Sequence, residues 1–201
     1  MVVGEPLRNG VPTPEEGAAL VALAVAVVAS RLQGQQPHPG VPESARLRAP
    51  GASFVTLERN GHLRGCIGTL DAQRPLYLDV TRNALKAMAD PRLPPVTATD
   101  WPELAVKVAV LTLPSPIAAA DRTELAAVLR PGIDGLILAE GALRATFLPA
   151  VWAKLPDPYE FVDALLAKGG WAAWSGGIQA FRYASIDFAD HSPRVPLGPV
   201  S

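Results

Sequence analysis

The hydrophobic positions change period along the chain, and each change predicts a different element. From Ala18 to Ala29 nearly every residue is apolar. The segment Thr13-Pro14-Glu15-Glu16 before this stretch combines a capping hydroxyl, a proline suited to the first helical turn and a glutamate three residues after the cap. We therefore expect a helix that runs to about Gln33 and is buried on most of its sides.

Two predicted hairpins share one pattern, in which two short apolar runs flank a turn. The first spans 52–67 around Asn60-Gly61, and the second spans 135–147 around Glu140-Gly141. Helical spacing and capping residues predict the helices, and alternation of apolar and polar residues predicts the remaining strands. These elements are helices over 75–89, 121–129 and 157–168, and strands over 104–113 and 178–188.

The two hairpins also share a sequence. Gly61-His62-Leu63-Arg64 recurs as Gly141-Ala142-Leu143-Arg144, and each copy follows a hydrophobic strand and precedes a helix and a further strand. The recurrence indicates a duplicated strand–strand–helix–strand unit, although four residues can also match by chance. The two copies would differ just after the match, where Gly65-Cys66-Ile67-Gly68 corresponds to Ala145-Thr146-Phe147-Leu148.

Composition narrows the functional classes. The 201 residues suit one large domain or two small subdomains, and the net charge of -1 argues against an extensive nucleic-acid footprint. One cysteine excludes an internal disulfide framework and a multi-cysteine metal site, and the three histidines lie far apart. We therefore expect no metal and no cofactor. The longest apolar stretch is too short to cross a bilayer and lacks the basic flank of a signal peptide, so we expect a cytoplasmic protein without membrane contact.

The most informative segment is Leu63-Arg64-Gly65-Cys66-Ile67-Gly68, in which two glycines bracket the single cysteine. Glycine inside a strand is typical of a bulge or of close approach by another backbone or a ligand. Alternation along a strand predicts Arg64, Cys66 and Gly68 on one face, an arrangement suited to an anionic or planar ligand. A guanidinium beside the thiol would also favour a reactive thiolate. The alternatives for Cys66 are packing as a small hydrophobe, contact with a ligand, and nucleophilic catalysis.

Charged residues near this segment are further candidates. Asp90 and Arg92 flank Pro91, where the helix over 75–89 should end. Either these two residues rim a pocket, or Asp90 is solvated and Arg92 lies on the surface. His62 lies four positions before Cys66, about 13 Å away along a strand, which is too far for a Cys–His pair.

The segment from Phe54 to Gly68 closely resembles the signature of the AMMECR family. Asp90-Pro91-Arg92 and the segment from Thr146 to Trp152 extend the resemblance, which covers roughly residues 15–190. The later segments look like the bacterial branch called AmmeMemoRadiSam system protein A, although Lys168-Gly169-Gly170-Trp171 replaces the usual Lys-Ala-Gly-Leu. The resemblance implies an α+β fold with two subdomains, each with an antiparallel sheet and flanking helices. In that family the side chains of the cysteine segment point toward a cleft at the seam between the subdomains.

The resemblance also sets the expected organisation and function. We expect a flexible leader over 1–12, a single AMMECR domain over 13–190 and an extended tail over 191–201, with the smaller subdomain in the middle of the chain. The protein would be an accessory or binding component that acts with a Memo-like protein and a radical-SAM protein, the companions that the system's name implies. A small molecule or a segment of a partner would lie in the cleft against the cysteine segment, Asp90 and Arg92. The alternatives are an enzyme with Cys66 as thiolate nucleophile, and nucleotide or RNA binding in the cleft.

Overall fold

The buried hydrophobic side chains form two clusters. In the computed structural model, which describes residues 11–190 and 193–197, each cluster belongs to one of two units. The first unit is the chain up to Leu111 and from Ile186 onward, and the second is the continuous segment Thr112–Ser185. Residues 1–10 of the predicted leader, and 191–192 and 198–201 of the predicted tail, lie outside the described residues.

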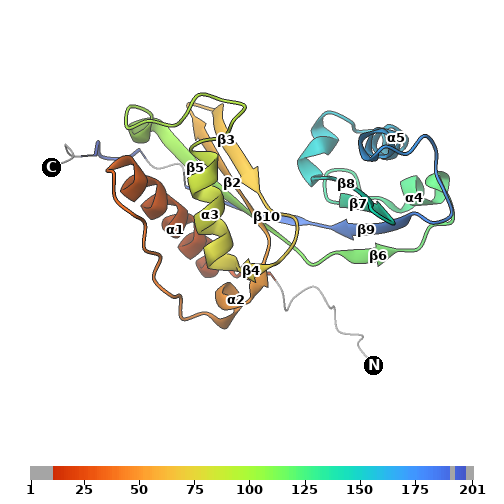
Figure 1. The fold of residues 1–201 in the computed structure, drawn as a ribbon, viewed down its shortest axis with the longest axis horizontal. Coiled ribbons are helices and arrows are strands. Elements are labelled where there is room, and N and C mark those ends of the chain that lie inside the picture. Colours follow the sequence, from red (N-terminus) through yellow and green to blue (C-terminus); the bar gives the residue numbers. More distant parts are fainter. Residues whose placement is uncertain (1–10, 191–192, 198–201) are drawn as a thin grey trace. The chain divides into compact units, whose positions relative to one another are not determined.

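The first unit contains the following elements: α1 (Pro14–Leu32), α2 (Ala45–Arg48), β1 (Pro50–Gly51), β2 (Ser53–Arg59), β3 (His62–Gly68), β4 (Arg74–Pro75), α3 (Leu76–Ala87), the 3-10 helix η1 (Trp101–Glu103), β5 (Leu104–Leu111) and β10 (Ser185–Asp190). Its main sheet has the strand order β10-β5-β2-β3, and β1 pairs with β4 in a separate two-stranded sheet. Helices α1 and α3 lie on the same side of the main sheet (Figure 1). Strand β3 is at one edge of the main sheet, beside β2 alone.

Helix α1 begins and ends where the sequence predicts. The Thr13 hydroxyl accepts a hydrogen bond from the Glu16 amide, and the Glu16 carboxylate accepts one from the Thr13 amide, so the capping box is complete. The expectation that this helix is buried on most sides is wrong, because only one stripe that includes Leu20, Ala24 and Val28 is buried. The exposed side carries Ala18, Ala19, Ala22 and Ala26. Alanine is the best helix former and has little apolar surface, so an alanine-rich stretch forms a helix without full burial.

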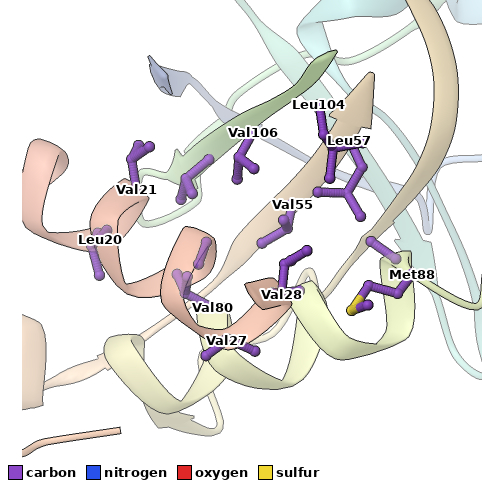
Figure 2. Close-up of a cluster of buried hydrophobic side chains, with 14 of the residues drawn as sticks. Leu20, Val21, Val27, Val28, Val55, Leu57, Val80, Met88, Leu104 and Val106 are labelled. Atoms are coloured by element: carbon purple, nitrogen blue, oxygen red, sulfur yellow. The ribbon is translucent and has the colours of Figure 1, made fainter. Parts of the chain in front are cut away.

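The core of the first unit lies between the main sheet and the two helices. Figure 2 shows Val55 and Leu57 of β2 pointing toward Val28 of α1 and Val80 of α3, and all four side chains are fully buried. Because side chains alternate along a strand, Thr56 points to the opposite face of the sheet, away from α1 and α3. The two faces of this sheet therefore have different environments.

The second unit has its own sheet, core and helices. Its elements are β6 (Ser115–Ile117), α4 (Arg122–Val128), β7 (Gly135–Glu140), β8 (Leu143–Phe147), the 3-10 helix η2 (Pro149–Ala153), α5 (Pro158–Gly169) and β9 (Gln179–Tyr183). The strand order is β6-β9-β7-β8, and each neighbouring pair is antiparallel. In the core, the rings of Trp152 and Phe161 stack with centroids 3.8 Å apart. Asp157 caps α5 as predicted, and Gly170, with a left-handed φ of 86°, ends it one residue later than predicted.

The two units share one topology. In each unit a hairpin, a helix and a third strand follow in order, and the third strand pairs with the first strand of the hairpin: β5 with β2, and β9 with β7. The predicted strand–strand–helix–strand unit is therefore present twice. The strand that follows each of these repeats in the chain joins the sheet of the other unit. Strand β6 follows β5 but pairs with β9, and β10 follows β9 but pairs with β5. We call this the exchange of strands.

The prediction of one continuous strand over 178–188 is wrong. Strand β9 ends at Tyr183, β10 begins at Ser185, and the two strands belong to different sheets. At the break, the Ala184 carbonyl accepts a hydrogen bond from the Thr112 amide at 2.9 Å, and the Ala184 amide donates to Thr112 Oγ1 at 2.9 Å. The alternating pattern runs through Ala184 without interruption, so it contains no sign of the change of sheet.

Candidate functional site

The cysteine segment occupies β3 and contains a bulge. Strand β3 pairs with β2 in register from Gly68 to Gly65, but the next paired residue is Leu63, so Arg64 is an extra residue on β3. A bulge of this kind re-aims the side chain of the extra residue. The expectation that Arg64 shares a face with Cys66 depended on strict alternation, and the alternation does not continue across Arg64.

Atoms of the protein itself lie against both glycines of the segment. A methyl group at Gly65 would overlap the carbonyl oxygen of Ala87 at the end of α3, and a methyl group at Gly68 would overlap the ring of Phe54. Gly65 therefore permits the close approach of another backbone, which is one of the two uses expected of a glycine in a strand. Neither glycine by itself indicates a ligand.

In the second unit the end of a helix also packs against the edge strand. There the glycine is on the helix, whereas in the first unit it is on the strand. Ala145 of β8 corresponds to Gly65, and it lies against the end of α5 at Gly169. A methyl group at Gly169 would overlap the ring of Trp171 and would lie 3.0 Å from the Cβ of Ala145. In both units one of the two residues at the crossing is glycine, although in the second unit the Trp171 ring, and not the strand, comes closest to it.

The Cys66 side chain is half-buried and has a polar neighbour. Its cross-strand partner is Thr56, whose hydroxyl donates a hydrogen bond to Sγ at 3.2 Å. Because Thr56 points away from α1 and α3, the thiol lies on that same face of the sheet. Within residues 11–190 and 193–197, no histidine or carboxylate is hydrogen-bonded to the thiol. Cys66 therefore lacks the adjacent base that commonly activates a nucleophilic cysteine.

Asp90 and Arg92 bind the backbone of Cys66. The Cys66 amide donates to Asp90 Oδ2 at 3.0 Å, and the Cys66 carbonyl accepts a hydrogen bond from Arg92 Nη2 at 2.8 Å. Arg92 also donates from Nε and Nη2 to the Asp90 carboxylate, at 2.9 and 2.7 Å. The hydrogen bonds from the Arg92 side chain and then from the Cys66 amide hold the pKa of Asp90 well below its ordinary value. Asp90 is only 2% exposed, so the alternative in which it is solvated is wrong.

We call this arrangement of Asp90, Arg92 and the Cys66 backbone the edge clamp. It occupies backbone groups that an edge strand would otherwise offer to a further strand. The second unit has a simpler equivalent, because Lys168 Nζ donates to the carbonyl of Thr146 at 2.9 Å, and Thr146 corresponds to Cys66. Both edge strands thus have a cationic side chain at the same carbonyl.

A groove of about 1130 Å³ lies beside β3 in the first unit. Its walls come from the ends of α1 and α3, the loops that follow these helices, and Ile67 of β3. Most of the lining side chains are apolar, such as Leu85 and Val96, and the charged lining residues are Arg31 and Lys86. Because basic residues are favourable at helix C-termini, these two cations do not by themselves indicate an anionic ligand.

A smaller polar pocket of about 400 Å³ shares Thr97 with the groove. Asp100 is 3% exposed and accepts hydrogen bonds from the Thr97 amide at 2.8 Å and from Arg64 Nη2 at 3.1 Å. Burial acts to raise the pKa of Asp100, but the hydrogen bonds from Thr97 and Arg64 outweigh it, so this pKa lies below its ordinary value. The residues that define the polar pocket are Arg59, Asn60, His62, Arg64, Thr97, Thr99 and Asp100.

The structure distributes the predicted site residues over several places. Ile67 lines the groove, Arg64 lines the polar pocket, and Cys66 lies on the sheet face beside Thr56. Leu63 is 46% exposed. In the first unit these side chains therefore do not converge on one hollow, and the cleft expected at the seam between the subdomains stays a prediction.

Three acids that are buried in the described residues were not predicted from the sequence, namely Asp79, Asp100 and Asp134. Asp79 of α3 is fully buried and accepts hydrogen bonds from the amide and the hydroxyl of Ser53 at the start of β2. Asn83 donates to the same carboxylate at 3.0 Å, and Arg74 forms an ion pair with it at 2.7 Å. A signal was present in the sequence, since Asp79 lies three residues after Leu76, on the apolar stripe of the helix.

Among the helices of residues 11–190, none is both long and apolar enough to span a membrane. The same residues, with 193–197, contain no cluster of three or more His, Cys, Asp or Glu side chains that could hold a metal ion.

The fold and the edge strand define an α+β protein in which one topology occurs twice and the first copy carries the cysteine segment. The AMMECR1 family profile matches residues 21–188, and the chain belongs to this family. A protein of Methanothermobacter thermautotrophicus is 36% identical over 161 residues, which cover 78% of this chain and 83% of that protein. A protein of Thermofilum pendens is 34% identical over 202 residues, which cover 90% of this chain and 92% of that protein.

A solved structure has the same fold. It is the uncharacterised protein PH0010 from Pyrococcus horikoshii, with a TM-score of 0.77 and 29% sequence identity over 90% of this chain and 94% of that one. These relatives are archaeal, and their names state no activity. The expected place of this chain in a bacterial branch stays a prediction.

Proposed function

We propose that this AMMECR1-family protein is a binding component that holds a small, mainly apolar molecule in the groove of its first unit. The observation that carries the proposal is the groove itself, whose volume of about 1130 Å³ is comparable with the largest ligand pockets. Apolar walls with a few polar groups are typical of small-molecule sites. Ile67 and Pro91 lie in the wall, and both belong to segments that resemble the family signature.

Rigid support of the walls favours a preformed site. Met88 and Val96 are 6% and 7% exposed, and the Val96 amide donates to the Met88 carbonyl at 2.9 Å, which joins the loop to the end of α3. The edge clamp fixes the residues on either side of Pro91. A preformed groove favours binding, because little conformational entropy is lost when a ligand enters it.

The lining residues favour binding over catalysis. Among the described residues, no Asp, Glu, His or Cys lines the groove, so that part of the chain places none of the groups that most often act as acids, bases or nucleophiles in its walls. We propose that any chemistry on the bound molecule belongs to companion proteins, a Memo-like protein and a radical-SAM protein. A thiol-based enzyme is the weaker candidate, because Thr56 provides the single hydrogen bond to Cys66 Sγ within the described ranges.

A groove-filling variant tests the proposal. Ala89 lines the groove and is exposed, so Ala89→Trp should fill the groove without disturbing the core. Ala22→Trp, on the exposed side of α1 and outside the groove, is the matched control. Native mass spectrometry of the full chain, after incubation with a small-molecule extract of the source cells, should show a bound mass for the unaltered protein and Ala22→Trp. Retention of the same mass by Ala89→Trp would contradict the proposal.

The partner part of the proposal has a separate test. A tagged full chain should recover the Memo-like or the radical-SAM protein from native cells. Recovery of neither would contradict the role beside companions and would leave the groove result unaffected. A Cys66→Ser protein that is fully functional in those cells would remove the thiol-based alternative.

A further inference from the structure

We propose that the polar pocket of the first unit is a binding site for an oxyanion, such as the phosphate or carboxylate group of a small molecule. The proposal does not rest on the function of the groove, because Thr97 is the one described residue that lines both hollows. Its basis is the hydrogen-bonding state of the side chains that line the pocket.

Two guanidinium groups in this pocket are only partly used. Arg64 donates from Nη2 to Asp100 at 3.1 Å and to the Pro95 carbonyl at 3.3 Å, and its buried Nε has no acceptor among the described residues. Arg59 donates from Nε to Glu103 at 2.7 Å and from Nη1 to Asp100 at 3.4 Å. Because a guanidinium has five N–H donors in a planar fork, each arginine retains donors for a carboxylate or phosphate.

Asp100 holds both arginines in place. Its side chain is 4% exposed and forms ion pairs with Arg64 at 3.1 Å and with Arg59 at 3.4 Å. The Thr97 amide and hydroxyl also donate to the Asp100 carboxylate, at 2.8 and 3.1 Å. These hydrogen bonds hold the carboxylate in position. Positioned arginines lose little side-chain entropy when an anion binds, so this arrangement favours binding of a charged ligand.

Further donors surround these arginines. The hydroxyl oxygens of Thr97 and Thr99 lie 2.8 Å apart, and the Thr97 hydroxyl is also within hydrogen-bonding distance of Asp100. When the Thr97 hydroxyl donates to Thr99 or to Asp100, the Thr99 hydroxyl can donate to a ligand. His62 lines the pocket and is exposed, and no hydrogen bond of its side chain is observed in the described ranges. The pocket therefore combines arginine, hydroxyl and imidazole groups, the usual donors to oxyanions.

The charge balance points to one anionic group and not to a polyanion. Within residues 11–190 and 193–197, the pocket lining has two arginines and one carboxylate, and Glu103 binds Arg59 from outside the lining. Glu103 therefore competes with a ligand for Arg59. A chain with net charge -1 and a pocket of about 400 Å³ suits a single phosphate or carboxylate, and not the extended backbone of a nucleic acid.

Sulfate is the probe for this site, because it remains a dianion at neutral pH. We expect that titration of the ¹⁵N-labelled full chain with sodium sulfate, at constant ionic strength, shifts the amide resonances of His62, Thr97 and Thr99. Arg59→Gln should weaken this binding about tenfold, the loss expected for a hydrogen bond to a charged group. Glu103→Gln should strengthen binding, because it releases Arg59. Arg82→Gln, an exposed position on α3 outside the pocket, is the control and should leave binding unchanged.

Three results would overturn the proposal. Sulfate could shift no pocket amide, Arg59→Gln could bind it as tightly as Arg82→Gln does, or Glu103→Gln could bind it more weakly than the unaltered chain. Parallel titrations with inorganic phosphate and with acetate decide which oxyanion the site prefers. The result for Ala89→Trp is independent, so failure of this site and failure of the groove can be told apart.

Discussion

Asp90 and Arg92 illustrate, at the scale of single residues, how a family signature can serve the backbone. Both side chains are hydrogen-bonded to the main chain of Cys66, at 3.0 and 2.8 Å, and not to its thiol. The sequence indicated that these three residues belong together, because all lie in segments that resemble the family. Their contacts could not be predicted, since the loop after α3 brings Asp90 to β3 across 24 positions of sequence. A motif therefore identifies a cluster of residues more reliably than the role of each member.

The edge clamp should make the stability of the protein depend on pH in the acid range. The folded state holds the pKa of Asp90 below its ordinary value of about 3.9. The ionised carboxylate thus contributes stability that is present above about pH 4 and is lost as the pH falls further, through the folded-state pKa. We expect Asp90→Asn to lower the midpoint of thermal unfolding at pH 7, and the difference from the unaltered protein to shrink below about pH 4.

The control for this prediction is a surface ion pair. Asp163 binds Arg122 at 2.5 Å, and the two side chains are 50% and 42% exposed. Asp163→Asn should change the unfolding midpoint little at any pH, because exposed ion pairs contribute little. A difference between Asp90→Asn and the unaltered protein that stays constant from pH 7 to the acid limit would show that the charge of Asp90 does not stabilise the fold.

At the scale of elements, the sequence predicted α1, α3, α4, α5 and both hairpins because their signals are local, and it did not predict the four-residue helix α2. Thr13 and Asp157 cap α1 and α5 as expected, and the turn at Asn60-Gly61 joins β2 to β3. The features that were missed depend on partners distant in sequence. The break at Ala184 is made by hydrogen bonds to Thr112, and the bulge at Arg64 appears only in the register with β2. The candidate site has the same character, since the groove and the polar pocket form where separate segments meet.

The crossing of α3 and β3 gives a direct test of the role assigned to Gly65. We expect Gly65→Ala to destabilise the protein by about 1–3 kcal/mol or more, because the new methyl group would overlap the Ala87 carbonyl oxygen and backbone must move. Gly40→Ala is the matched control, with nothing within 4 Å of the new methyl group, and should change stability by less than about 0.5 kcal/mol. Urea denaturation of the three proteins measures both effects. Equal stability of Gly65→Ala and the unaltered chain would mean that Gly65 is not required for packing.

At the scale of the whole molecule, the exchange of strands means that the second unit is built from one segment of the chain and the first unit from two. The second unit is the continuous segment Thr112–Ser185 and contains all four strands of its sheet. The first unit needs β10, which the chain reaches only after it has completed the second unit. The first unit therefore cannot be obtained by cutting the chain at Leu111 without loss of a strand from its sheet.

Fragments should reflect this difference. We expect residues 112–185 to fold alone, because the fragment keeps its own buried cluster with the stacked Trp152 and Phe161. Residues 1–111 should be less stable than the first unit in the full chain, since β5 loses its neighbour β10. Dispersion of amide resonances and cooperative thermal unfolding of each fragment would measure this. An unfolded fragment 112–185 would contradict the independence of the second core.

The hydrogen bonds between Thr112 and Ala184 place the entry and the exit of the second unit next to each other. A segment whose two ends are adjacent can be removed or replaced while the flanking chain keeps its course, as in natural domain insertions. A fluorescent reporter with closely spaced termini could thus be grafted between Leu111 and Ile186. In such a chimera β5 would lead into the reporter and the reporter would lead into β10. A structural change in the first unit would then alter the fluorescence.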